Sequence, residues 1–87
     1  MNDEQIQEVR QYRAKLEADK KYLREMTELA VQHRMFIVWC VIVGLPVNRM
    51  VRTSNIMLER IDKMRNCLES VEEAVQALEI ICGERTT

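Results

Sequence analysis

Residues 35–47 read Met-Phe-Ile-Val-Trp-Cys-Val-Ile-Val-Gly-Leu-Pro-Val and contain no charged side chain. The segment ends beside Pro46, the chain's single proline, which follows Gly44 by two residues. Glycine adopts the left-handed conformation that closes a helix, and the residue before a proline is pushed out of the α region. A segment that is apolar on every side has to be buried in a partner, a second copy or a membrane. We interpret residues 35–47 as the closed end of a helical hairpin and call them the tip.

The segments on both sides of the tip have the composition of helices. The chain has 87 residues, of which 31% are charged and 47% hydrophobic, with two glycines and one proline. The abundance of Glu, Lys, Arg, Leu, Met and Ala predicts long helices and argues against disorder or a turn-rich sheet. A chain of this length has difficulty burying enough surface alone. We therefore expect one all-α domain that assembles with other chains.

Before the tip, apolar residues recur at alternating spacings of three and four. This line consists of Val9, Tyr12, Leu16, Asp19, Leu23, Met26, Ala30, His33, Ile37 and Cys40. A pattern sustained over more than four heptads is typical of a coiled-coil seam, here interrupted only by Asp19 and His33. We expect Asp19 to sit at the seam's edge, where it reaches water or pairs with Lys15, Lys20 or a partner's arginine. The alternative is a polar layer that sets the register or selects a partner. A second apolar line, formed by Tyr22, Leu29 and Phe36, indicates a further packing neighbour.

After the tip, apolar residues again recur at alternating spacings of three and four. This apolar line of the second half consists of Val47, Met50, Ser54, Met57, Ile61, Met64, Leu68, Val71, Val75, Leu78 and Cys82. Only Ser54 is polar, so the second half of the chain also has one continuous seam. Two matched seams on either side of one break predict an antiparallel hairpin. Folding near residue 45 makes the numbers of facing residues sum to about 90.

Local signals give the expected helix boundaries. Asn2 with Gln5 three residues later resembles a capping box, and Gly83 is a typical helix stop. We predict a first helix at about 3–43, a turn at about 44–46, a second helix at about 47–82 and a frayed tail at 83–87. The run Thr53-Ser54-Asn55 leaves open a later start of the second helix, near Asn55.

The tip and the second apolar line favour assembly as a dimeric four-helix bundle, most simply a two-fold homodimer. The expected interface residues are Phe36, Ile37, Trp39, Cys40, Val41, Val43, Leu45 and Val47. The corresponding function is a non-catalytic oligomeric scaffold or adaptor that acts through coiled-coil protein–protein interaction. A further protein would bind the exposed helix faces.

A basic run at the start of the second helix suggests an alternative function. It consists of Arg49, Arg52, Arg60, Lys63 and Arg65. Such a run is ordinarily a solvated helix face. Doubled in a homodimer, it could contact the backbone of double-stranded RNA, which helical proteins recognise by shape. The interleaved Glu59 and Asp62 count against this alternative.

A membrane-interface hairpin that inserts its apolar tip is the second alternative. Thirteen uncharged residues are too few to span a bilayer, which requires roughly 20. Trp39 is nevertheless a residue type that favours the membrane–water boundary. The N-terminal residues are acidic and polar, and they are not typical of a signal peptide.

The sequence offers no constellation for chemistry. His33 and the three cysteines, Cys40, Cys67 and Cys82, lack the spacing of metal ligands, so we expect no metal, cofactor or catalytic site. One histidine and no Gly-rich loop also argue against an enzyme. The odd number of widely spaced cysteines favours reduced thiols in an intracellular protein, cytoplasmic or nuclear.

Overall fold

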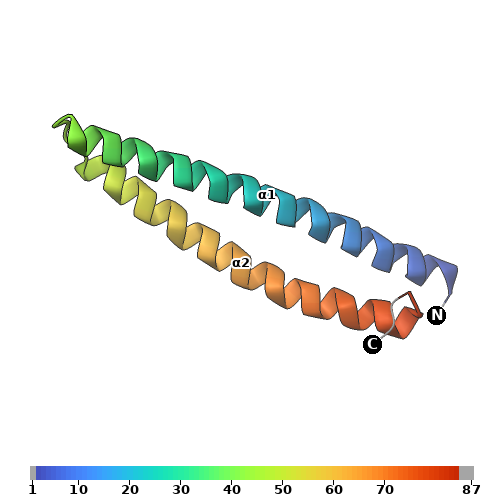
Figure 1. The fold of residues 1–87 in the computed structure, drawn as a ribbon. Helices are drawn as coiled ribbons and strands as arrows, with labels where there is room; N and C mark the ends of the chain where they lie inside the picture. Colours follow the sequence, from blue (N-terminus) through green and yellow to red (C-terminus); the bar gives the residue numbers. More distant parts are fainter. Residues whose placement is uncertain (1, 85–87) are drawn as a thin grey trace.

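The computed structural model describes residues 2–84 and shows a hairpin of two antiparallel helices, with no strand in this part of the chain. Helix α1 spans Asp3–Ile42 and helix α2 spans Asn48–Cys82 (Figure 1). The molecule is a rod with extents of 63 × 21 × 15 Å, and the start of α1 lies beside the end of α2. The predicted all-α helical hairpin is therefore confirmed. Of the predicted tail, residues 85–87 lie outside the described part.

The first helix begins with the predicted capping box. The side chain of Asn2 accepts a hydrogen bond of 2.8 Å from the backbone N–H of Gln5. The backbone N–H of Asn2 in turn donates to the side-chain oxygen of Gln5 at 3.2 Å. Asp3 and Glu4 in the first turn complement the positive end of the helix dipole.

The turn at the tip closes α1 with a Schellman motif. Gly44 has φ +80°, a left-handed conformation that costs glycine little. The N–H of Leu45 donates to the carbonyl of Cys40 at 2.9 Å, and that of Gly44 donates to Val41 at 3.2 Å. Helix α2 begins at Asn48, one residue after the predicted start, so the later start near Asn55 is not adopted.

Helix α2 ends in the same way. Gly83 has φ +76°, and its N–H donates to the carbonyl of Ile80 at 3.1 Å. The N–H of Glu84 donates to the carbonyl of Glu79 at 2.9 Å. The predicted stop at Gly83 is therefore confirmed, by the same left-handed closure as at Gly44.

The core follows mainly one line of residues on each helix, at seven-residue spacing. Buried members of these two lines are Val9, Leu16 and Ala30 of α1 and Ser54, Ile61, Leu68 and Val75 of α2. Leu16, Leu68 and Val75 form the central cluster, against which Leu23 and Met64 pack. The predicted positions three residues further along are mostly less buried, and Tyr12 remains 48% exposed. Two helices alone cover only a narrow arc of each other, so part of each wide apolar stripe stays uncovered.

Ion pairs between the helices establish the register. The residue numbers sum to 92 in both Arg13–Glu79 and Lys20–Glu72, close to the predicted sum of about 90. Within residues 2–84, neither helix is long and apolar enough to cross a membrane.

Candidate functional site

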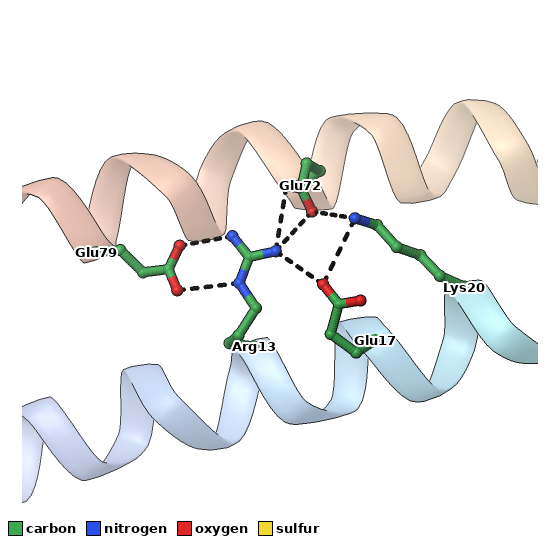
Figure 2. A network of polar contacts seen from close by, with 5 residues as sticks. All are labelled: Arg13, Glu17, Lys20, Glu72 and Glu79. Atoms are coloured by element: carbon green, nitrogen blue, oxygen red, sulfur yellow. Dashed lines mark hydrogen bonds and ion pairs between the residues drawn. The ribbon is translucent and has the colours of Figure 1, made fainter. Parts of the chain in front are cut away.

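One side of the hairpin is bridged by a charge network (Figure 2). The guanidinium of Arg13 donates to both carboxylate oxygens of Glu79, at 3.0 Å from Nε and 2.5 Å from Nη2. Its Nη1 also donates to Glu72 at 2.9 Å, and Lys20 Nζ lies 2.8 Å from the same Glu72 oxygen. Glu17 completes the network with contacts of 3.2 Å to Arg13 and 3.6 Å to Lys20. We call this the charged side.

The network holds its members in their charged forms. The pKa of Glu72 is lowered, first by its hydrogen bond from Lys20 and then by its hydrogen bond from Arg13, although partial burial opposes the shift. The pKa of Arg13 is raised, chiefly by its hydrogen bonds to Glu79. The apolar spacing of the sequence did not predict this network. The signal that could have revealed it is the seven-residue spacing of Arg13 with Lys20 and of Glu72 with Glu79.

The opposite side of the hairpin is mostly apolar. At about 100° per residue, Arg13 and Lys20 lie about 40° from the buried line of α1 in one direction. Asp19 and Met26 lie about 60° away in the other direction, and Tyr22 lies about 100° away in that direction. We call this second side the open face. Its members are Glu8, Tyr12, Lys15, Asp19, Tyr22, Met26, Leu29 and Phe36 of α1 and Arg60, Met64, Cys67, Val71, Ala74, Leu78 and Ile81 of α2.

Two grooves run between the helices on the open face. Asp19 lines both grooves, together with Tyr22, Met64 and Cys67 in one and with Tyr12 in the other. The second groove is also lined by Lys15, Leu16, Val71, Ala74, Val75 and Leu78. The predicted second apolar line stays uncovered here, because Tyr22 and Leu29 are each 53% exposed and Phe36 is 52% exposed. The open face is therefore ready to pack against further helices.

The tip is also uncovered. Of the predicted interface residues, Phe36, Trp39, Val41, Val43 and Leu45 are exposed, whereas Ile37 and Val47 are half-buried. The rings of Phe36 and Trp39 stack with their centroids 6.0 Å apart. Cys40 is only 1% exposed, because it packs inside the hairpin itself, and it offers almost no surface to a partner.

The basic run does not form a single row. All five side chains are exposed, but Arg65 lies about 40° from the buried line, on the charged side, and pairs with Asp62 at 3.2 Å. The other four are spread over about 100° of α2, from Arg60 on the open face to Arg52 on the outward side. They are Arg49, Arg52, Arg60 and Lys63.

The other residues considered for chemistry are dispersed. Cys40 is buried, Cys67 is exposed and Cys82 is half-buried, and no three His, Cys, Asp or Glu side chains within residues 2–84 converge on a metal position. Among residues 2–84, the buried polar atoms His33 Nδ1 and Ser54 Oγ find no hydrogen-bond partner. Ser54 is 3% exposed and occupies a core position of α2, so its hydroxyl weakens the packing toward the tip.

No known protein family, curated protein or solved structure matches this chain. The open face, the tip and the charged side are the surfaces through which this chain can act on other molecules.

Proposed function

We propose that this chain is a non-catalytic oligomeric scaffold or adaptor that acts through helix–helix packing with other protein chains. The observation that supports this proposal is the exposed apolar surface of the tip, where Met35 is 67% exposed and Ile42 is 77% exposed. The tip continues through Phe36 into the open face. Soluble proteins that act alone rarely expose so large a contiguous apolar patch, and a patch of this kind marks an interaction surface.

The energy available from this surface is large. Phe36 and Trp39 are each about half exposed, so each has roughly 100 Å² left to bury. At ~25 cal/mol/Å² each ring contributes about 2.5 kcal/mol to an association. The tip and the open face together expose several times the apolar area of these two rings. Burying that area would release more free energy than the association cost of about 4–15 kcal/mol.

A homodimer that forms a four-helix bundle is the simplest assembly. Two hairpins that bury one apolar side each reproduce the usual packing of such bundles. Two-fold symmetry is the most common solution for identical chains. The charged side and the outward faces of the helices then remain available to a further protein.

The solution mass tests the proposal. Light scattering on the wild type should give at least twice the 10.3 kDa of one chain. Phe36→Asp should shift the protein toward monomer, because it places a charge in the apolar interface. Val31→Asp is the matched control: Val31 is 54% exposed, close to Phe36 at 52%, but lies outside the tip and the open face. A wild type that is a well-folded monomer would refute the proposal, as would co-flotation of the tip with liposomes in place of self-association.

Binding of double-stranded RNA is the second candidate. The observation in its favour is that Arg49, Arg52, Arg60 and Lys63 are exposed and take part in no ion pair within residues 2–84. Binding through these cations should weaken steeply with salt. The double variant Arg49→Glu/Arg52→Glu should abolish binding of a duplex while leaving the circular dichroism spectrum unchanged. Equal binding by the wild type and the variant would exclude this surface.

A further inference from the structure

The open face carries opposite charges at different positions along the rod. Asp19 is half-buried and lines the same groove as Cys67. Arg60 precedes Cys67 by seven residues, two helical turns, so it lies on the same face. Neither Asp19 nor Arg60 takes part in an ion pair formed by the described residues. A half-buried carboxylate on an apolar face is costly unless a cation reaches it.

Asp19 and Arg60 of one chain are too far apart to pair with each other. Because facing residues sum to 92, Arg60 lies level with about residue 32 of α1. It is therefore about 13 residues, or roughly 20 Å, from Asp19 along the rod. The point midway between them lies level with residues 25–26. This is also the middle of the paired part of the hairpin, which runs from about Val9 to Ile42.

We propose that a second copy of this chain covers the open face in the antiparallel direction, about a two-fold axis near residues 25–26. Asp19 of each chain then lies level with Arg60 of the partner subunit, across the interface. This inference rests on the proposed oligomeric scaffold, and it specifies the occupant of the open face and its direction. About this axis the two rods overlap along their whole length. The arrangement that brings opposite charges to the same level is therefore also the one that buries the most surface.

One further cation of the open face agrees with this axis. Lys15 comes level with Phe36 of the partner subunit, where an ammonium group can lie over the ring. The apolar residues also match. The tip of each chain is covered by the end of the partner's rod that lies away from its own tip, where Tyr12 is 48% exposed and Ile81 is 68% exposed.

A parallel dimer on the same face lacks these advantages. A two-fold axis along the rod would place Asp19 beside Asp19 and Arg60 beside Arg60. Like charges facing each other in apolar surroundings disfavour that arrangement. The antiparallel axis instead places Cys67 of α2, level with about residue 25, close to its own copy.

Charge exchange at the two positions tests the pairing. Asp19→Arg and Arg60→Asp should each raise the dimer's dissociation constant by about tenfold or more, because each leaves like charges facing each other. The double variant Asp19→Arg/Arg60→Asp restores opposite charges and should return the dissociation constant to within about threefold of the wild type. Glu28→Arg makes a similar charge change on the exposed outward side of α1 and should leave dimerisation unchanged.

Distance measurement tests the direction. A spin label on Asn48→Cys, in a Cys67→Ser/Cys82→Ser background, lies at the tip. In the antiparallel dimer the two labels should be about 55 Å apart, whereas parallel packing would bring them within about 30 Å.

The outcomes separate this inference from the scaffold proposal. A dimer whose tip labels are close together, or one that the double variant fails to restore, overturns the antiparallel arrangement while self-association stands. A wild-type monomer overturns both. Restoration by the double variant together with the long label distance supports the arrangement described above.

Discussion

The contact between Arg13 and Glu79 allows a quantitative test of the register. Both side chains are mostly buried, with 21% and 14% of their surface exposed, and two hydrogen bonds join them. Hydrogen bonds to charged groups contribute about 1.5–3 kcal/mol, and the remaining contact with water reduces that value. We expect a coupling energy of about 1–2 kcal/mol between these two residues.

The measurement is a double-mutant cycle with Arg13→Met, Glu79→Gln and the combined variant. Urea unfolding followed by circular dichroism gives the free energy of unfolding of each protein. All samples must have the same protein concentration, because the stability of an oligomer depends on concentration. The cycle removes whatever other contacts each side chain makes and leaves the energy of the pair.

The pair Arg10–Glu84 is the matched control. It joins the same two helices at 2.8 Å, but its side chains are 56% and 32% exposed. Exposed ion pairs contribute between 0 and about 1 kcal/mol, so we expect a coupling below about 0.5 kcal/mol. A coupling at Arg13–Glu79 no larger than at Arg10–Glu84 would contradict the conclusion that the charged side stabilises the hairpin.

Three further predictions concern the stability of the fold. Leu16→Ala should lower the free energy of unfolding by about 2–5 kcal/mol, because Leu16 is 1% exposed in the central cluster; a loss below 1 kcal/mol in urea unfolding would count against that cluster. Ser54→Ala should raise the free energy of unfolding by about 1 kcal/mol, since it removes a buried hydroxyl without a partner, and a destabilised variant would show that the hydroxyl is satisfied in solution. Because the pKa of Glu72 is lowered in the folded protein, its stabilisation is complete above the ordinary carboxyl pKa of about 4.3 and is lost as the pH falls through the lowered value. Melting temperatures measured from pH 7 to pH 3 should therefore fall less in Glu72→Gln than in the wild type, and parallel curves would be inconsistent with this role.

The architecture could be predicted from local signals. Asn2 with Gln5 marks the start of α1, and Gly44 and Gly83 mark both helix ends, because each signal depends only on residues within one or two turns. The apolar rhythm also predicted the side of each helix that turns toward the other helix. Hydrophobic spacing did not distinguish the buried line from the line beside it, since both are apolar.

The difference between the charged side and the open face could be predicted only with knowledge of the register between the two helices. Tyr12 and Val71 belong to the predicted seams but remain 48% and 39% exposed, because the other helix covers only the neighbouring line. The role of Arg13 depends on carboxylates 59 and 66 residues away in sequence. No local rule predicts such contacts, although the repeated seven-residue spacing on each helix is consistent with them.

The strongest contacts between α1 and α2 lie far from the turn, and this affects how the hairpin forms. The central cluster and the charge network lie toward the end of the rod away from the tip, and Arg13 contacts Glu79 across 66 residues of sequence. Closing a loop of that length costs about 1.7 kcal/mol more than closing one of ten residues. The short-range contacts beside the turn are easier to form but include Ser54, whose hydroxyl is unsatisfied. The hairpin therefore depends on contacts far from its turn, and we expect a second chain that covers the tip to stabilise the part of the rod where the two helices pack least well.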